Sequence, residues 1–127
     1  MSGAVLVDTD IVIDFLRGNG QAVAYVKSVS DSVCFSAITV SEIHAGTRGS
    51  REETEVERLF SLFPVIAVTG EIAREAGKLV KTYRPSHAVE IPDAIIAATC
   101  HLTDAALSTL NVKHYPMFRA LKPPYTK

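Results

Sequence analysis

Residues 4–16 read AVLVDTDIVIDFL, and this run decides the fold. Residues 4–7 form a short, continuous apolar block, which is typical of a strand buried on both faces. The block ends at Asp8, and apolar residues at helical spacing follow it: Ile11, Val12, Phe15 and Leu16. Asp8 therefore lies where a buried strand gives way to a helix.

Asp8 allows two interpretations. In open α/β sheets, ligands bind in the crevice at the carboxyl ends of the strands, and a carboxylate there needs a cation or a hydrogen-bond donor. The same residue could instead cap the helix and favour the positive end of its dipole. Asp8 alone favours neither interpretation, so the other acidic residues of the chain must decide.

Strands and helices are predicted in alternation along the rest of the chain. Apolar blocks predict strands at 33–35, 65–68 and 105–109, and helical spacing predicts helices at 36–46, 50–63, 69–83 and 92–102. Alternation of this kind indicates a central parallel sheet, so the fold class is α/β. Asp14 is expected on the solvated outer face of the first helix, and the C-terminal end is expected to fray.

The composition is that of one compact domain over residues 1–127. Hydrophobic residues make up 47% and charged residues 21% of the chain, which excludes a disordered protein. The net charge of −1 excludes attraction to nucleic acid by overall charge alone. Residues 105–127 nevertheless lack Asp and Glu and carry four cations: Lys113, Arg119, Lys122 and Lys127. This basic end is either a phosphate-facing surface or a solvated tail.

The two cysteines, Cys34 and Cys100, lie in apolar runs and are expected to be buried rather than paired or metal-bound. The N-terminal apolar run is too short for a secretory leader, and no run reaches the length of a membrane span. We therefore expect a cytoplasmic protein without a membrane partner.

Asp8, Glu42 and Asp93 occupy equivalent places in the predicted fold. Asp8 follows the first strand, Glu42 lies in the helix after the second strand, and Asp93 begins the most apolar helix. A parallel sheet brings these places to one edge, so the carboxylates are expected to converge. Clustered carboxylates repel one another unless a cation lies among them, and Mg²⁺ or Mn²⁺ prefers oxygen ligands. Such a site would support metal-assisted hydrolysis of a phosphodiester.

Each acid also has a purely structural interpretation. Glu42 could complete a capping box with Thr39, three residues before it, and Asp93 could only favour its helix dipole. Asp10 could hydrogen-bond the loop near Asp8 or reach a metal through water.

Four runs of the sequence resemble the PIN-domain family of nucleases and, within it, the VapC-type toxins of toxin–antitoxin pairs. The runs are VDTDIVIDFL (7–16), ITVSEIHAGT (38–47), IPDAIIAAT (91–99) and LSTLNVKHY (107–115). Their order and spacing extend over nearly the whole chain. The resemblance implies a three-layer α/β/α fold, a magnesium-dependent endoribonuclease activity on RNA, and a cognate antitoxin protein that inhibits the site.

Carried over position by position, the resemblance implies that Asp8, Glu42 and Asp93 are the acidic metal ligands. Many relatives have a fourth acid after the last strand, where this chain has Asn111. Asparagine can orient water through its carbonyl oxygen but carries no charge, which weakens the case for a second metal ion. Lys113 and His114, beside Asn111, could contact substrate phosphate, or they could be solvated loop residues.

Two other functions compete with this hypothesis. Asp8 and Asp10 after a first strand also suit the nucleophile and acid of a haloacid-dehalogenase-like phosphatase, although that mechanism has no role for Glu42. With Asn111 in place of an acid, the chain could instead be a catalytically weak module that binds RNA or a protein partner. A homodimer is expected from the apolar residues of the 50–63 helix region.

Overall fold

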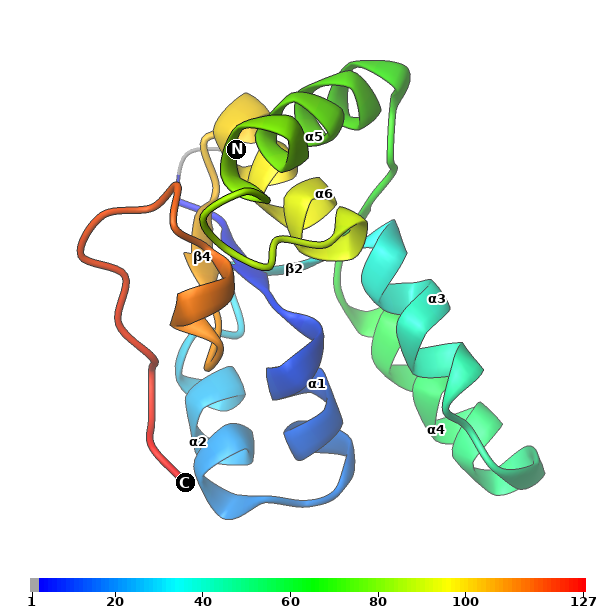
Figure 1. The fold of residues 1–127 in the computed structure, drawn as a ribbon. Helices are drawn as coiled ribbons and strands as arrows, with labels where there is room; N and C mark the ends of the chain where they lie inside the picture. Colours follow the sequence, from blue (N-terminus) through cyan, green and yellow to red (C-terminus); the bar gives the residue numbers. More distant parts are fainter. Residues whose placement is uncertain (1–2) are drawn as a thin grey trace.

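The computed structural model describes residues 3–127 and contains one four-stranded sheet (Figure 1). All neighbouring strands are parallel, in the order β3-β2-β1-β4. The strands are β1 (Val5–Val7), β2 (Val33–Ser36), β3 (Val65–Ile66) and β4 (Ala106–Ser108). The predicted α/β class with a central parallel sheet is confirmed. The last two strands are shorter than the predicted blocks at 65–68 and 105–109.

Helices surround the sheet, and those predicted at 36–46, 50–63, 69–83 and 92–102 form with ends that differ from the prediction by at most one residue. The helices are α1 (Thr9–Leu16), α2 (Gly20–Ser28), α3 (Ala37–Ala45), α4 (Gly49–Leu62), α5 (Gly70–Tyr83), α6 (Ile91–Thr103) and the short 3₁₀ helix η1 (Val112–His114). Side-chain caps explain several starts. Asn19 accepts the N–H groups of the first turn of α2, and Thr69 accepts the Ile72 N–H of α5 at 3.1 Å.

Alternate residues of the strands face two separate cores, which makes the molecule three-layered. Leu6 and Cys34, paired in register between β1 and β2, point to the core covered by α5 and α6. Val7 and Phe35 point to the opposite core, which α1, α2, α3 and α4 complete. Figure 1 shows α5 and α6 above the sheet and α1 and α2 below it. Both faces of the sheet are therefore apolar, which explains the continuous apolar runs of its strands.

Asp14 is buried, contrary to the expectation of a solvated outer helix face. Its side chain is only 5% exposed, because the C-terminal residues return across α1. The Tyr125 hydroxyl donates to Oδ2 at 2.8 Å, and Lys127 Nζ donates to Oδ1 at 2.9 Å. The expected fraying of the C-terminal end is therefore also wrong. Burial acts to raise the pKa of Asp14, but the hydrogen bonds from Lys127 and Tyr125 outweigh it and lower the pKa.

Cys34 and Cys100 are both buried and unpaired, as predicted. Over residues 3–127, no helix is both long enough and apolar enough to cross a membrane.

Candidate active site

Asp8 lies at the junction of β1 and α1, where it is the N-cap of the helix. Its backbone is extended, with φ −71° and ψ 158°, and its Oδ1 accepts the Thr9 N–H at 2.8 Å. The capping interpretation is therefore confirmed for one oxygen of this carboxylate. The other oxygen, Oδ2, faces groups from distant parts of the chain.

Two buried hydroxyl groups donate to Oδ2 of Asp8. Thr109, directly after β4, donates at 2.7 Å, and Tyr115, directly after η1, donates at 2.9 Å. Neither residue is singled out by the sequence, because a lone Thr or Tyr has many structural roles. The sequence feature that could have pointed to Thr109 is its place at the carboxyl end of a predicted strand, beside the expected position of Asp8.

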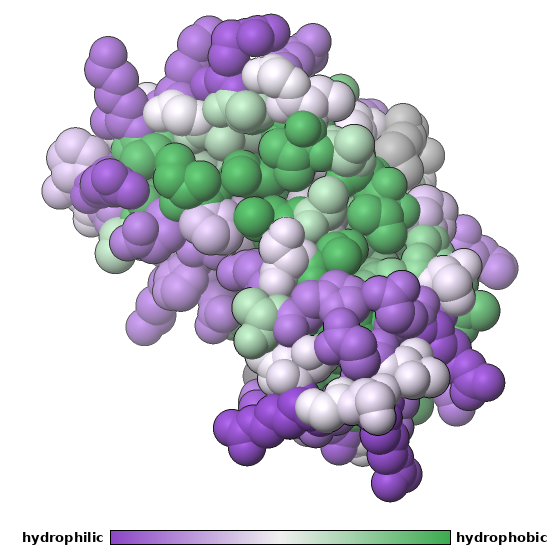
Figure 2. Space-filling view, turned by 90° about the vertical axis from the view of Figure 1, so that its right-hand side faces the viewer, coloured by the Kyte–Doolittle hydropathy of each residue, from purple (hydrophilic) through white to green (hydrophobic). Residues whose placement is uncertain are grey.

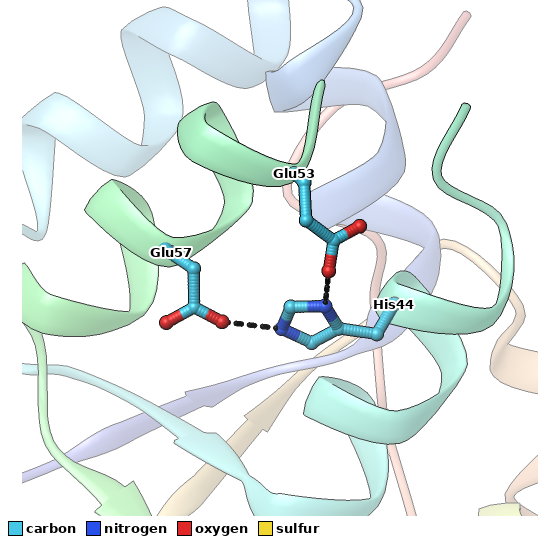
Figure 3. A group of neighbouring side chains, drawn as sticks. All are labelled: His44, Glu53 and Glu57. Carbon is cyan, nitrogen blue, oxygen red and sulfur yellow. Dashed lines mark hydrogen bonds and ion pairs between the residues drawn. The ribbon is translucent and has the colours of Figure 1, made fainter. Parts of the chain in front are cut away.

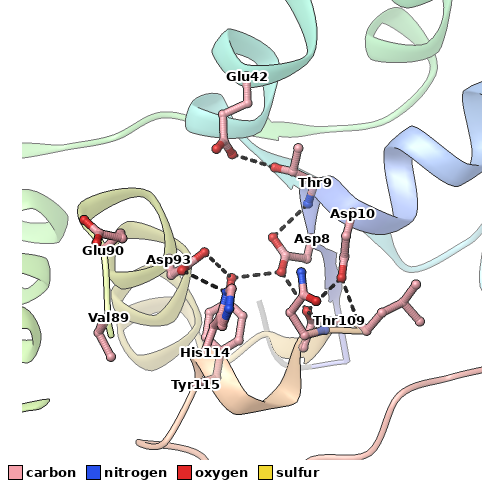
Figure 4. Close-up of polar contacts among 12 residues, drawn as sticks. Asp8, Thr9, Asp10, Glu42, Val89, Glu90, Asp93, Thr109, His114 and Tyr115 are labelled. Carbon is pink, nitrogen blue, oxygen red and sulfur yellow. Dashed lines mark hydrogen bonds and ion pairs between the residues drawn. The ribbon is translucent and has the colours of Figure 1, made fainter. Parts of the chain in front are cut away.

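Asp93 faces Asp8 from the first turn of α6, where Pro92 occupies one of the first positions as predicted. Its Oδ1 lies 3.4 Å from the Tyr115 hydroxyl, and its Oδ2 lies 3.4 Å from Nδ1 of His114. Figure 4 shows Asp8 and Asp93 on either side of this hydroxyl. Burial and the charge of Asp8 raise the pKa of Asp93, and the nearby His114 opposes this shift.

Glu42 reaches the same region from α3, and its contact is not a capping box. Its Oε1 accepts the Thr9 hydroxyl at 2.7 Å. The N-cap of α3 is Ser36, which accepts the Ile38 N–H, so the predicted cap by Thr39 is wrong. Thr39 is instead buried inside the helix, 2.9 Å from the Thr9 hydroxyl. Thr9 thus connects Glu42 to the Asp8 junction (Figure 4).

Asp10 binds the segment that follows β4, as one of its two sequence interpretations expected. Its Oδ2 accepts the Leu110 N–H at 2.9 Å and lies 3.4 Å from the Thr109 hydroxyl, while Oδ1 accepts the Ile11 N–H at 2.8 Å. Burial and the charge of Asp8 raise the pKa of Asp10 from 3.8 to about 6.

The candidate substrate-binding residues lie just beyond this segment. Asn111 is exposed, and its backbone N–H donates to Thr109 Oγ1 at 3.0 Å. Lys113 is exposed on η1, and His114 pairs with Asp93. Asn111 and Asp10 also line a cavity of about 490 Å³ that extends to Arg17, the C-cap of α1.

A second cavity, of about 520 Å³, lies on the other side of α1, between α1, α3 and α4. Glu42 forms part of its lining, together with Arg17 and Arg48. Arg17 therefore lines both cavities, and each cavity brings cationic side chains beside an acid of the candidate site.

Outside the candidate site, another group of side chains brings potential metal ligands close to one another. His44 on α3 lies 2.6 Å from Glu53 and 3.0 Å from Glu57, both on α4 (Figure 3). Among residues 3–127, only this group combines three such residues with ligand atoms within 4.8 Å of one another. The two carboxylates contact opposite ring nitrogens of His44. The group is therefore better described as a polar link between α3 and α4 than as a metal centre. The predicted set of Asp8, Glu42 and Asp93 is more open than this group.

The charge of the site suits a hard divalent cation. Asp8 and Asp10 are stabilised by neutral hydroxyl and backbone donors, and Nδ1 of His114 lies 3.4 Å from Asp93 Oδ2. Burial first, and then the charge of Asp8, raise the pKa values of both Asp10 and Asp93, so a cation bound here would be favoured by the carboxylates. Carboxylate oxygens from Asp8 and Asp93 could hold such a cation, with Glu42 nearby.

A sequence model of the PIN domain matches residues 5–115. This chain belongs to the PIN-domain family. Two relatives from Mycobacterium tuberculosis are 40% identical to it over 124 residues. Ribonuclease VapC10 is matched over 95% of this chain and 92% of its own length. Ribonuclease VapC19 is matched over 94% of this chain and 98% of its own length. The resemblance inferred from the four motif runs is confirmed.

Solved structures share the fold of this PIN domain. A toxin–antitoxin complex from Klebsiella pneumoniae has a TM-score of 0.83 at 29% identity, covering 96% of this chain and 98% of the other. A DNA-bound VapBC from Salmonella typhimurium has a TM-score of 0.80 at 19% identity over 97% of both chains, which supports the fold alone. Membership of the PIN-domain family favours the nuclease hypothesis over the phosphatase alternative.

Proposed function

We propose that residues 1–127 form one PIN domain that acts as the toxin of a toxin–antitoxin pair, a magnesium-dependent endoribonuclease. The observation that carries the proposal is the 40% identity to ribonucleases VapC10 and VapC19 over nearly the whole chain. The meeting of Asp8 and Asp93 at the edge of the sheet supports it. RNA as the substrate implies action in the cytoplasm.

Asp8 and Asp93 would hold Mg²⁺ directly, and Mn²⁺ could replace it, because both ions prefer oxygen ligands. When bound, such an ion lowers the pKa of a water molecule and neutralises charge on a phosphodiester oxygen. Glu42, oriented by the Thr9 hydroxyl at 2.7 Å, would position the attacking water or accept its proton. Asn111 would help to orient water through its amide.

Lysine, arginine and histidine side chains around the site would bind the RNA backbone. Lys113 and His114 lie on the element next to Asp93, and Arg17 lines the cavities on both sides of α1. Arg48 lines one of these cavities beside Glu42. Phosphate contacts of this kind release counterions, so RNA binding would weaken as salt is raised.

Two protein partners are part of the proposal. A cognate antitoxin is supported by the likeness to a chain of the Klebsiella pneumoniae toxin–antitoxin complex. A homodimer is supported by exposed apolar side chains near the end of α4, where Leu62 is 68% and Val65 40% exposed. Figure 2 shows a band of apolar side chains across the face that forms the right-hand side of Figure 1. Sedimentation of the parent and of Leu62→Glu would test the dimer, which the charge should dissociate.

RNA cleavage by the purified chain tests the function. We expect cleavage in Mg²⁺ or Mn²⁺, none in excess chelator, and none by Asp93→Asn in either metal. A generic phosphomonoester supplied in parallel should remain intact, since its hydrolysis would favour the phosphatase. If the folded parent binds neither ion in calorimetry and cuts no RNA, the chain is instead a binding module.

A further inference from the structure

Tyr115 places one hydroxyl group between two acids of the candidate site. The residue follows η1, its side chain is only 1% exposed, and it is the largest fully buried side chain of the described chain. The hydroxyl lies 2.9 Å from Asp8 Oδ2 and 3.4 Å from Asp93 Oδ1 (Figure 4). It is therefore a polar contact that joins the end of β1 to the first turn of α6.

The contacts of Asp8 show what this hydroxyl does. Thr9 occupies Oδ1 through its N–H, and Thr109 and Tyr115 together occupy Oδ2. A carboxylate offers about four lone-pair positions, so three donors fix its rotation and leave one position for a ligand. Neutral donors achieve this without neutralising the charge that would attract a cation.

The ring of Tyr115 has a separate role from the hydroxyl. It packs in the core beneath α5 and α6, with its centroid 6.3 Å from that of Phe118. A phenylalanine would fill the same space, so packing alone does not require an oxygen atom at this position. The polar end of the side chain is used only at the acidic edge.

We propose that Tyr115 is a positioning residue whose hydroxyl sets the orientation of Asp8 and its distance from Asp93, so that both carboxylates meet one divalent cation. The inference rests on the proposed function, because it assigns that function's metal to these two acids. Groups that orient metal ligands in this way typically contribute about 10–100-fold to metal affinity or activity.

Tyr115→Phe, compared with Tyr83→Phe as a control in the same core, tests the inference. We expect Mn²⁺ binding, measured by calorimetry on the metal-free protein, to weaken by at least about tenfold in Tyr115→Phe and to stay unchanged in Tyr83→Phe. The RNA kcat should fall by about tenfold or more, with a nearly constant KM. Thr109→Val removes the other hydroxyl from Asp8 Oδ2 and should weaken Mn²⁺ binding in the same direction.

The outcomes separate this inference from the function on which it rests. If the parent cleaves RNA and Tyr115→Phe binds Mn²⁺ as tightly as the parent, the positioning role is overturned and the function stands. If the parent cuts no RNA but Tyr115→Phe still weakens Mn²⁺ binding, the function fails and the positioning role stands. A parent that binds no Mn²⁺ overturns the positioning role, whatever the RNA assay shows.

Discussion

The hydroxyl of Thr9 donates to Oε1 of Glu42 at 2.7 Å, and the N–H of the same threonine donates to Asp8 at 2.8 Å. One residue thus holds an acid of α3 and an acid of the β1–α1 junction in a fixed relation. Because Thr9 lies in the first turn of α1, any change in the start of this helix would move both carboxylates together.

Glu42→Gln should strongly slow RNA cleavage while leaving the fold intact. Glutamine retains a carbonyl oxygen that can accept the Thr9 hydroxyl, but it cannot accept a proton from water. We expect a loss of about 10²-fold or more in cleavage rate, with an unchanged thermal midpoint. Glu71→Gln, on the exposed side of α5, is the matched control. Full activity of Glu42→Gln would remove Glu42 from the site.

Asp8→Asn should lose both Mn²⁺ binding and cleavage. The amide can still accept the Thr9 N–H and can donate to the hydroxyls of Thr109 and Tyr115, so the fold should survive. Calorimetry with Mn²⁺ checks the loss of binding, an RNA assay checks the loss of cleavage, and a thermal melt checks that the fold survives. Asp31→Asn, at an exposed position before β2, should behave as the parent. Parent-like cleavage by Asp8→Asn would contradict the site assignment.

His44→Ala distinguishes the two groups of potential metal ligands. The contacts of His44 with Glu53 and Glu57 are partly exposed, so their loss should lower the thermal midpoint only slightly. We expect the Mn²⁺ stoichiometry and the cleavage rate to remain those of the parent. A variant that loses its Mn²⁺ binding would instead place the functional metal between α3 and α4.

The metal-free protein should lose stability as the pH rises through the titration of Asp10. Burial and the charge of Asp8 raise its pKa from 3.8 to about 6 in the folded state. The folded state therefore holds a proton on Asp10 that the unfolded state releases. The stability that this proton contributes is fully present below pH 3.8 and is lost as the pH rises through about 6.

We expect the resulting loss to be about 1–2 kcal/mol, after allowance for solvent screening. Urea unfolding of the parent and of Asp10→Asn at pH values between 3.8 and about 6 measures this loss of unfolding free energy. The variant should be less stable throughout, because one amide oxygen replaces two acceptors, but its slope with pH should be smaller. Equal slopes in the two proteins would be the contrary result.

Deletion of residues 125–127 should destabilise the fold. Tyr125 and Lys127 donate to the buried carboxylate of Asp14, and hydrogen bonds to charged groups contribute about 1.5–3 kcal/mol each before relaxation. We expect a net loss of about 2 kcal/mol in urea unfolding. Lys122→Ala, an exposed cation nearby in sequence, should have no effect. An unchanged midpoint after deletion would show that the C-terminal contacts are not stabilising.

The sequence by itself determined the α/β class, the parallel sheet and the place of Asp8 at the end of β1. These features depend on the spacing of apolar residues and on turn residues, which are local properties of the chain. The four motif runs also determined the family. Local pattern was a poorer guide to caps, since Thr39 and Glu42 have the spacing of a capping box and yet Ser36 is the N-cap.

Only the tertiary structure decided which groups satisfy the buried carboxylates. Thr109 and Tyr115 reach Asp8 across 101 and 107 residues of chain, and Lys127 reaches Asp14 across 113. The spacing of residues along the sequence does not reveal such distant hydrogen-bond partners. They are set by the pairing of β1 with β4 and by the path of the C-terminal segment over α1, and a buried charge must find its donors wherever the fold brings them.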